Sequence, residues 1–400
     1  MSRTPTSPPI EVDASTHAPL GMSSEIFLRD YWQKHPLLIR NAFADFETPI
    51  EPEDLAGLAC EEFALSRIVM FDRANDRWTL RHGPFEEAEF PGMPTHDWTL
   101  LVQDVDKWDA DVAHVLDAFD FLPRWRIDDV MVSFAAPGGS VGAHVDQYDV
   151  FLLQAKGSRR WQVDASKAPD MTFRDDADLR LLRTFNNTHE WVLGPGDMLY
   201  LPPGVPHHGV AEDACLTFSI GMRAPSAAEL LGDFVDTLSE DADESLRYQD
   251  PDLAPDTDPA EIDAAAMTRA VEALNALRMN DPDRLGDWFG RFITTYRAGG
   301  EVAAGPDERS RIEVEWDLER GAVLVRHPFS RMAWRRARKG ARLYVSGRDM
   351  ALPTRDASRI ANTRRLDGGT YLRLSQAGRD AVIDLMAQGH YHLDIDEDEA

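Results

Sequence analysis

The chain has 400 residues, of which 43% are hydrophobic and 28% are charged, and its formal net charge is −28 at pH 7. This balance is ordinary for a globular protein, so it excludes general disorder, and the length allows two or three domains. Two cysteines exclude a disulfide framework and fit a reducing compartment. Because no apolar run approaches the length that spans a bilayer, we expect no membrane partner and a cytoplasmic protein.

The N-terminal half is rich in short β-type runs. The opening MSRTPTSPPIEVDAST has no apolar signal core, so a flexible tail is expected over 1–24. Over 25–225, Gly and Pro turns separate runs that are typical of a β-sandwich or barrel. These runs are RWRIDDVMVSFA, HVDQYDVFLLQ, RRWQV, EWVL, DMLYLP and CLTFSIGM.

Helical patterns follow this β region. Ser226-Ala227-Ala228-Glu229 forms a capping box, which predicts the start of a helix. After the acidic, Pro-rich QDPDLAPDTDP, a second helix is predicted around Val271 and a third through Phe292, the last ending at Gly299-Gly300. Their apolar stripes lie between two separately folding units, so we expect the protein to be a homodimer whose interface is built by residues 226–300.

The C-terminal part is expected to contain strands and one more helix. From about residue 301, apolar residues alternate again in Ile312, Val314 and Trp316 and then in Val323 and Val325, which predicts strands. A last helix is predicted near 375–388, before the acidic tail DIDEDEA.

A basic block interrupts the acidic chain over 321–379, where fourteen Lys or Arg stand against three Asp or Glu. No recognition-helix or RNA-binding motif accompanies it. We therefore interpret the block as a solvated face, neutralised by acidic parts of the chain or of a neighbouring subunit, and expect no direct nucleic-acid binding. A nucleic-acid patch is the alternative.

The candidate metal ligands occur in GAHVDQYDVF and GDMLYLPPGVPHHG. His144 and Asp146 are two residues apart on a predicted strand, so their side chains share a face, as does Tyr148. The turn Pro-Pro-Gly-Val-Pro then delivers His207 or His208, and spacing alone does not choose between them. Two imidazoles and one carboxylate form the facial triad of non-haem Fe(II) oxygenases, which leaves open positions for a 2-oxo acid and O2.

An inward arginine could bind that 2-oxo acid. In GSRRWQV, alternation places Arg159 on the face of Trp161 and Val163, with Arg160 on the other face. A buried arginine demands an anion, and its planar fork suits a carboxylate such as that of 2-oxoglutarate. The alternative is an internal salt bridge to an aspartate.

Two further strands offer polar side chains at alternate positions. IDDVMVSFA aligns Asp129, Met131 and Ser133 on one face, and CLTFSIGM aligns Thr217 with Ser219. If Ser133 faces the pocket, so do the other two residues on its strand. The hydroxyl groups could bind the cosubstrate, or neighbouring backbone could satisfy them.

The motifs GGSVGAHVDQYDVFLLQ, GSRRWQV and PGDMLYLPPGVPHHG resemble the JmjC ribosomal oxygenases, in particular the bacterial ribosomal protein arginine 3-hydroxylases, and FLRDYWQKHPLLIRNAF is similar to the family's N-terminal segment. The resemblance implies a mainly β plus α protein. Its catalytic domain over 25–225 would be a double-stranded β-helix of the cupin or jelly-roll type. A helical dimerisation domain over 226–300 and a winged-helix-like domain over 301–400 would follow.

The same resemblance implies a dioxygenase that uses Fe(II), 2-oxoglutarate and O2 to hydroxylate C3 of an arginine in a basic large-subunit ribosomal protein. By motif position, His144, Asp146 and His207 would bind iron. Arg159 and Ser133, with Thr217, would hold 2-oxoglutarate. The substrate arginine would meet Asp129, Met131, Tyr148, Ser219 and Met222. The chain departs from the family at His208, where relatives usually carry an acidic residue.

Other functions stay open at this point. The same chemistry could act on a protein histidine or, as a demethylase, on a lysine; a cupin could also bind metal without turnover, or the basic block could make a scaffold. Asp129 beside Tyr148 favours a guanidinium, since a carboxylate and an aromatic ring both complement it. The inward Arg159 argues against a cupin that only binds metal.

Overall fold

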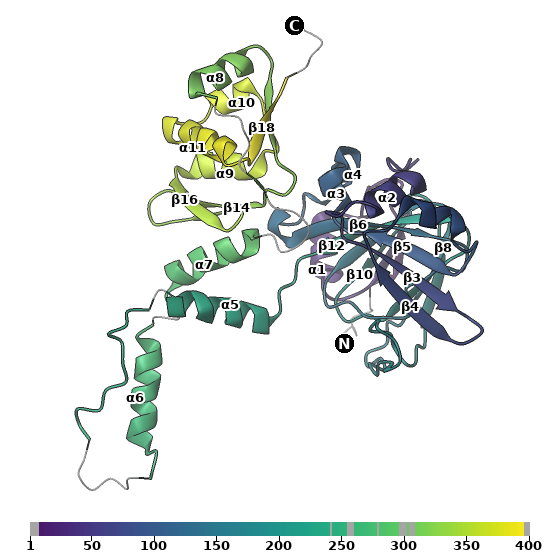
Figure 1. The fold of residues 1–400 in the computed structure, drawn as a ribbon, viewed down its shortest axis with the longest axis horizontal. Helices are drawn as coiled ribbons and strands as arrows, with labels where there is room; N and C mark the ends of the chain where they lie inside the picture. The colour runs from purple at the N-terminus through teal and green to yellow at the C-terminus, as the bar shows by residue number, and fades with distance from the viewer. Residues whose placement is uncertain are drawn as a thin grey trace, which may run out of the picture. The chain divides into compact units, whose positions relative to one another are not determined.

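The structure is a computed structural model that describes residues 8–240, 242–253, 260–277, 280–295, 302–303 and 309–395. The chain divides into two compact units, the first ending at Ala224 and the second beginning at Pro225 (Figure 1). Among the described helices, none is long and apolar enough to cross a membrane.

The first unit is built on two β-sheets. In the larger sheet the strand order is β1-β2-β10-β7-β12-β6-β5-β3-β4, and in the smaller one it is β11-β8-β9. The strands of the larger sheet are β1 Glu11–Asp13, β2 Leu37–Arg40, β3 Ser66–Asp72, β4 Arg77–His82, β5 Trp98–Val102, β6 Ile127–Ala135, β7 Val150–Lys156, β10 Met198–Leu201 and β12 Cys215–Met222. Those of the smaller sheet are β8 Arg159–Val163, β9 His189–Leu193 and β11 His207–Ala211.

Apolar side chains join the two sheets. Leu152 and Leu199 of the larger sheet share one buried cluster with Trp161, Val163 and Leu193 of the smaller sheet. This inner cluster is what the period-2 alternation of the strands buries. The arrangement is the predicted double-stranded β-helix, and the prediction is confirmed.

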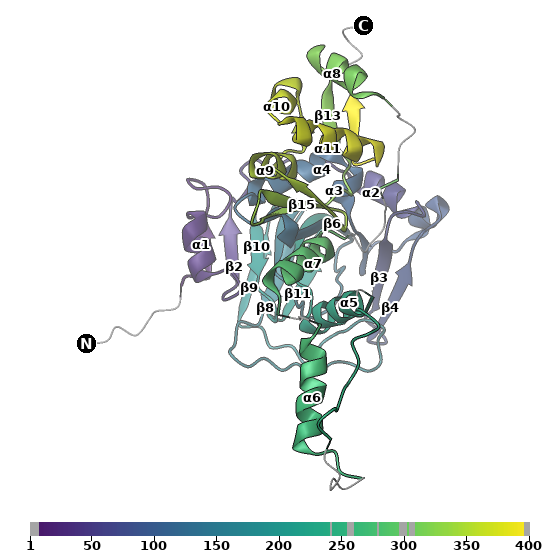
Figure 2. The same ribbon diagram turned by 90° about the vertical axis from the view of Figure 1, so that its left-hand side faces the viewer.

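Helices and aromatic residues cover the larger sheet. The helices of the first unit are α1 Ser24–Asp30, α2 Pro52–Ala59, α3 Val105–Trp108 and α4 Ala110–His114, with 3-10 turns η1 Glu87–Gly92, η2 Val115–Phe119 and η3 Arg124–Arg126. Helix α1 lies beside β2 and β10 (Figure 2). Its Phe27 is fully buried and packs edge-on against Tyr200 with 4.9 Å between ring centroids. Large aromatic burial of this kind makes the sheet a rigid support for the loops that it carries.

The N-terminal segment is part of this unit and not a free tail. Strand β1 pairs in parallel with β2, and Ala14 and Leu20 are buried. The Tyr31 hydroxyl also donates to the Pro9 carbonyl at 2.8 Å. The tail predicted over 1–24 is therefore wrong from residue 8 onward, because a strand of three residues is too short to give a recognisable alternation; residues 1–7 lie outside the described residues.

The predicted strand over His144 and Asp146 is also wrong. The chain from Val141 to Asp149 is a loop, and β7 begins only at Val150. His144 instead forms a single antiparallel bridge with His207, in which each backbone N–H donates to the other residue's carbonyl at 3.0 Å. The bridge ties the loop to the edge of the smaller sheet, so the two motifs still meet.

The second unit combines helices with two small sheets. Its strand orders are β17-β13-β18 and β14-β15-β16. Its helices are α5 Ala227–Glu240, α6 Ala264–Asn275, α7 Pro282–Thr294, α8 Arg311–Glu319, α9 Thr354–Asn362, α10 Gly368–Leu372 and α11 Gln376–Ala387. Its strands are β13 Val323–Arg326, β14 Met332–Arg336, β15 Ala341–Val345, β16 Arg348–Leu352, β17 Arg365–Leu366 and β18 Tyr391–Asp394.

Several predictions for this unit are confirmed. The capping box before α5 is formed, with the Ser226 N–H donating to Glu229 at 2.7 Å and the Glu229 N–H donating to Ser226 Oγ at 3.1 Å. Helices α6 and α7 and the last helix, α11, lie where the pattern predicts them. Helix α7 ends at Thr294, and Gly299-Gly300 lies outside the described residues.

The alternation around Ile312 and Trp316 does not make a strand. These residues belong to α8, whose N-cap is Ser310. Val314 and Leu318, four residues apart, are buried, whereas Ile312 is 79% exposed. A helix that buries one narrow stripe can show an apolar residue at every second position by coincidence, which misled the strand prediction.

The boundary predicted between residues 300 and 301 separates elements that pack together. Helix α7 contacts β14, β15 and β16. A Cβ atom on Gly290 would lie 2.4 Å from the Tyr344 ring, so helix and strand approach as closely as a glycine allows. Asp287 of α7 accepts hydrogen bonds from the Tyr344 hydroxyl and from Arg335, both at 2.7 Å. Helix α7 therefore belongs with the C-terminal sheets.

Candidate active site

The loop after β6 and the turn before β11 carry the candidate metal ligands. His144 and Asp146 lie in the loop, and His207 is the first residue of β11 rather than the far end of β10. Gly204 of the Pro-Pro-Gly turn has φ +80°, a conformation that favours glycine. Its N–H donates to the Asp146 carbonyl at 2.8 Å, so this bond and the His144–His207 bridge fix the loop on both sides.

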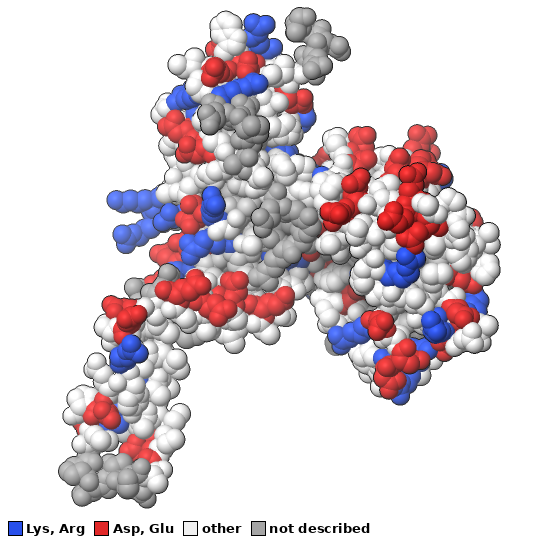
Figure 3. Space-filling view, viewed as in Figure 1, with Lys and Arg blue, Asp and Glu red and all other residues white. Residues whose placement is uncertain are grey.

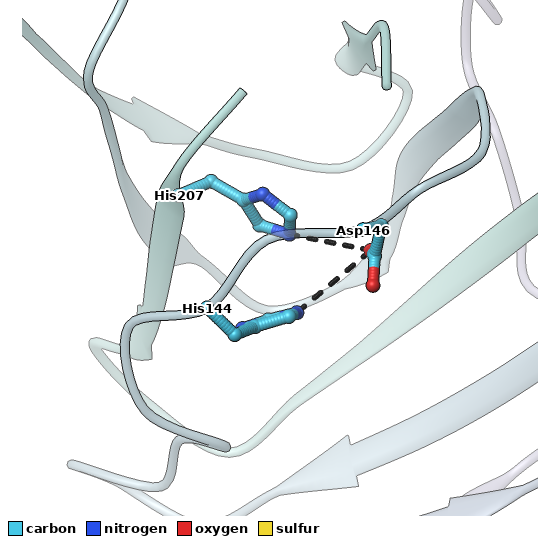
Figure 4. A group of neighbouring side chains, drawn as sticks. All are labelled: His144, Asp146 and His207. Carbon is cyan, nitrogen blue, oxygen red and sulfur yellow. Dashed lines mark ion pairs between the residues drawn. The ribbon is translucent and has the colours of Figure 1, made fainter. Parts of the chain in front are cut away.

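The three side chains point toward one another (Figure 4). Oδ2 of Asp146 lies 3.8 Å from Nε2 of His144 and 3.6 Å from Nε2 of His207. The two imidazole centroids are 4.3 Å apart, and all the ligand atoms fall within 4.8 Å of one another. These separations are too long for hydrogen bonds and leave room for one cation among the three atoms.

The far side of each imidazole is held by backbone. Nδ1 of His144 lies 2.9 Å from the Gly142 carbonyl, and Nδ1 of His207 lies 3.0 Å from the Val205 carbonyl. A carbonyl only accepts, so each Nδ1 carries the proton and each Nε2 keeps its lone pair for a metal. Burial and the neighbouring His144 lower the pKa of His207, which keeps that ring neutral. The donor set fits a divalent iron ion.

The neighbouring His208 lies outside this cluster. It follows His207 on β11, so its side chain points to the other face, where its ring lies 6.1 Å from that of Phe185. Burial and the nearby Arg159 lower its pKa to about 4. The geometry thus favours the first histidine of the pair, which spacing could not do.

Arg159 is buried, as predicted, and projects from the smaller sheet toward the larger one. Its Nη1 lies 3.5 Å from Ser133 Oγ and 3.4 Å from Thr217 Oγ1, and its Nη2 donates to the Gly209 carbonyl at 3.3 Å. Within the described part of the chain no carboxylate pairs with it, and its Nε has no partner. The alternative of an internal salt bridge is therefore not what the structure contains.

An unpaired buried guanidinium is costly, which indicates a site for an anion. Burial lowers the pKa of Arg159, since the charged form lacks a counter-ion. The Trp161 ring lies 4.9 Å from the guanidinium carbon, and its buried indole N–H has no partner among the residues that the structure describes. A Cβ atom on Gly209 would lie 2.7 Å from Arg159 Nε, so only glycine leaves the arginine this path.

All the candidate residues line one cavity of about 540 Å³. They are His144, Asp146, His207, Arg159, Ser133, Thr217, Asp129, Met131, Tyr148, Ser219 and Met222. Strand register orders the wall: Ser133 pairs with Thr217, Met131 with Ser219, and Asp129 with Gly221. The cavity therefore runs from a hydroxyl-rich end at Arg159 to an acidic end at Asp129.

The acidic end is electrostatically strained. Burial, reinforced by Asp104 and Asp106, raises the pKa of Asp129 to about 7. Asp129 Oδ2 accepts the Asp104 N–H at 3.1 Å, but in the described residues no cation pairs with it. Tyr148 is 41% exposed, and burial of its hydroxyl raises its pKa, so the phenol stays protonated. A cationic side chain placed here would relieve the strain.

Other residues of the cavity were not predicted from the sequence. They include Arg67 on β3, Thr99 on β5 and Gln103 just after β5. The loop between β8 and β9 adds Leu179 to Leu181. Strand β3 reads as an ordinary apolar strand, and the alternation that identifies Arg159 gives no signal for Arg67, which is half-buried between the buried Ser66 and Ile68.

Comparison with known proteins gives independent evidence for the family of this chain. Residues 114–230 match the JmjC domain family, and residues 276–392 match the ROXA-like winged helix family, which includes α7. The Escherichia coli (strain K12) ribosomal protein uL16 3-hydroxylase is 38% identical over 83% of this chain and 86% of that protein. A probable ribosomal oxygenase of Haemophilus influenzae is 40% identical over 59% of this chain and 56% of its own length.

Solved structures of the Escherichia coli ribosomal oxygenase YcfD have the same fold. One superposes with a TM-score of 0.85 at 34% identity and covers 94% of this chain and 99% of that one. Another, in complex with cobalt and 2-oxoglutarate, superposes with a TM-score of 0.82 at 32% identity and the same coverage.

Proposed function

Because this chain belongs to the JmjC ribosomal oxygenases, we propose that it hydroxylates C3 of an arginine in a large-subunit ribosomal protein, with uL16 as the first candidate. The chain is an Fe(II)- and 2-oxoglutarate-dependent protein hydroxylase that uses O2 as its second cosubstrate. The observation that carries the choice of arginine is Asp129, whose carboxyl group lines the same cavity as the iron site and has no cationic partner among the described residues. A ribosomal substrate would place the enzyme in the cytoplasm.

In this proposal His144, Asp146 and His207 hold the iron. Their support is the common orientation of two imidazoles and one carboxylate. When bound, iron and 2-oxoglutarate supply an oxidant that can hydroxylate an unactivated C–H bond. The protein itself has to orient the two substrates and exclude water.

Arg159 would bind the distal carboxylate of 2-oxoglutarate, with Ser133 and Thr217 beside it. The Thr217 hydroxyl donates to Gln154 Oε1 at 3.2 Å, which fixes its rotation. The two unpartnered donors, Arg159 Nε and Trp161 Nε1, lie at the same end of the cavity. A dicarboxylate that reaches from the iron to this end would supply the missing acceptor.

The substrate arginine would enter at the other end. Asp129 would pair with its guanidinium, with the Tyr148 ring beside it. Met131 and Met222 line the same cavity and would flank the aliphatic stem, and Ser219 is the register partner of Met131. A neutral side chain would leave the Asp129 carboxyl uncompensated, so this end should prefer a cation.

The surface charge suits a basic protein substrate. Acidic side chains gather on the first unit around α2 to α4, and basic side chains project from the second unit near β14 to β16 (Figure 3). The acidic surface would raise the encounter rate with a basic ribosomal protein. Part of the basic block is neutralised within the chain, as in Arg335–Asp287 at 2.7 Å and Arg342–Asp349 at 3.1 Å, which is in line with our expectation of no direct nucleic-acid binding.

A homodimer through α5 and α6 belongs to the same proposal. Leu231 of α5 and Met267, Val271 and Leu274 of α6 are all more than half exposed. Among its described residues α6 buries none, so its apolar stripe would be covered by a second copy. Light scattering should give the mass of a dimer at micromolar concentration, and a monomer mass would contradict this part.

The direct test of the function is turnover of a uL16 peptide. Purified enzyme with Fe(II), 2-oxoglutarate and O2 should release succinate and add one oxygen atom to the arginine of the peptide. Matched peptides with Lys or His at the target position serve as controls. Hydroxylation of the His peptide in preference to the Arg peptide would show that the target is histidine and not arginine. Succinate formation without any hydroxylated peptide would show that uL16 is not the substrate.

A further inference from the structure

The cavity wall extends from β6 onto the neighbouring strands β5 and β3. This part of the wall is formed by Arg67 and Val69 of β3, Thr99 and Leu101 of β5, and Gln103 just after β5; we name these five residues the β3–β5 lobe. In the sheet register Arg67 pairs with Leu101, and Leu101 pairs with Ser133. The lobe therefore extends the pocket-facing wall of β6 sideways, on the same face of the larger sheet.

Arg67 stands at the border between the lobe and the arginine subsite. Its Nη2 lies 3.8 Å from Sδ of Met131, a residue of the proposed arginine subsite. Within the described residues no carboxylate pairs with this guanidinium. The thioether is a weak acceptor, so the strong donors of Arg67 remain available to a ligand in the cavity.

The rest of the lobe also offers unused polar groups over an apolar floor. Val69 and Leu101 are buried. Thr99 Oγ1 is buried, and none of the described residues forms a hydrogen bond with it. In the described part of the chain the Gln103 amide likewise forms no side-chain hydrogen bond. An apolar floor with hydrogen-bond donors at its border matches an extended peptide, whose carbonyl groups point sideways at regular intervals.

The charge around the lobe argues against an acidic ligand. Asp104, Asp106, Asp128 and Asp129 all lie on the neighbouring elements, and Asp128 and Asp129 line the cavity itself. Such a border would repel an acidic side chain. Main-chain carbonyl groups are neutral acceptors that every substrate segment carries, and the guanidinium fork can donate to them in pairs.

We propose that the β3–β5 lobe binds the main chain of the substrate segment next to the target residue, with Arg67 donating to its carbonyl oxygens. This proposal rests on the proposed function only in requiring a polypeptide substrate. Arg67 is then a residue that positions the substrate segment. It determines how many residues on either side of the target a peptide needs for tight binding.

The test compares a long uL16 peptide, which keeps the natural residues on both sides of the target, with a short one that keeps a single residue on each side. Arg67→Ala should raise KM for the long peptide about tenfold to a hundredfold, as expected for hydrogen bonds to a charged donor. It should leave KM for the short peptide and kcat for both peptides close to the wild-type values. Arg77→Ala, an exposed arginine at the start of β4 that lies outside the cavity, is the matched control.

Arg67→Lys keeps the positive charge but loses the paired donors of the guanidinium, so it should lose most of the difference in KM between the long and the short peptide. It also provides a test if the alanine variant does not fold. Equal losses with long and short peptides would overturn the proposal, as would no loss with either. A loss seen only when the flank contains Asp or Glu would also overturn it, in favour of an acidic ligand.

The readout separates this proposal from the proposed function. Succinate release without peptide reports the iron and 2-oxoglutarate sites alone, and Arg67→Ala should not change it. If the wild-type enzyme hydroxylates a residue other than arginine, the choice of target fails, and the long-to-short comparison is then made on the peptide that turns over.

Discussion

The two ends of the cavity solve opposite electrostatic problems. Arg159 is 3% exposed, has hydroxyl and carbonyl neighbours and lacks a counter-ion in the described residues. Asp129 is only half-buried as a residue, but burial of its carboxyl group, reinforced by Asp104 and Asp106, raises its pKa to about 7. A closed cationic end suits a small cosubstrate of fixed charge, whereas an open acidic end suits a side chain delivered by a larger partner. The iron ligands lie in the same cavity, and reaction requires both ends to be filled.

Removing a metal ligand should abolish the reactions of both substrates, whichever end of the cavity each one occupies. Asp146→Ala or His207→Ala should abolish both succinate release and peptide hydroxylation, because each removes one of three ligands. His208→Ala should retain substantial activity, since its side chain leaves β11 on the other face. Metal content measured on the purified variants checks the assignment, and iron lost from His208→Ala but kept in His207→Ala would reverse it.

The cationic end should respond to 2-oxoglutarate alone. Arg159→Ala should raise the apparent requirement for 2-oxoglutarate by an amount worth about 2–5 kcal/mol, because it removes a buried charged partner. Arg160→Ala is the control: that side chain is more exposed and pairs with Glu190 and Glu212 at 2.6 Å, so its loss should change the 2-oxoglutarate requirement little. Titration of 2-oxoglutarate at saturating peptide gives both values, and similar effects would break the inward–outward distinction.

The acidic end should respond to the peptide alone. Asp129→Asn should lower kcat/KM for an arginine peptide by an amount worth about 1.5–3 kcal/mol, the range for a hydrogen bond to a charged group. Its uncoupled succinate release should match the wild type. An arginine peptide turned over equally well by both enzymes would leave the guanidinium pairing without support.

The same carboxyl group predicts a pH dependence. In the free enzyme the raised pKa of Asp129, about 7, means that its proton must leave before a guanidinium pairs with it. Arginine-peptide affinity should therefore be full above pH 7 and fall as the pH drops below 7, by up to about tenfold per unit. Asp129→Asn has no proton to lose, so its profile over this window should be flat.

Substitution of a glycine at each end of the cavity should have smaller effects on substrate binding. A Cβ on Gly209 would meet Arg159 Nε at 2.7 Å, whereas one on Gly221 would lie 3.3 Å from Asp129 Oδ1. Gly209→Ala should weaken 2-oxoglutarate binding by about 1–3 kcal/mol, the typical cost of overpacking. Gly221→Ala should have a smaller effect, confined to the peptide. Steady-state kinetics with each substrate varied in turn would show whether the effects stay at their own ends.

Alternation along real strands explains why much of the site could be predicted from the sequence. Arg159 lies on β8, and Asp129, Met131 and Ser133 lie on β6, so the period of two gives their faces correctly. The pairing across strands, such as Ser133 opposite Thr217, depends on register, and only the structure supplies it.

The errors arise where local pattern and tertiary packing differ. His144 and Asp146 occupy a loop and meet His207 through one bridge, a long-range contact that no local period encodes. Arg67 reaches the cavity because β3 extends the sheet beyond β5 and β6, which is a matter of strand order. Helix α7 packs closely on the C-terminal unit at Gly290. The sequence around this glycine does not show that the Tyr344 ring lies against it.

The central claim, an iron-dependent hydroxylation of a ribosomal arginine, is tested most directly on ribosomes. Intact-mass and fragment-mass spectra of large-subunit proteins should be compared between wild-type cells and cells that lack this chain. We expect uL16 to be heavier by one oxygen atom in wild-type cells, with the extra mass on a single arginine, and a strain that carries Asp129→Asn to lose most of it. Identical spectra from both strains, or the extra oxygen on a histidine, would contradict the account.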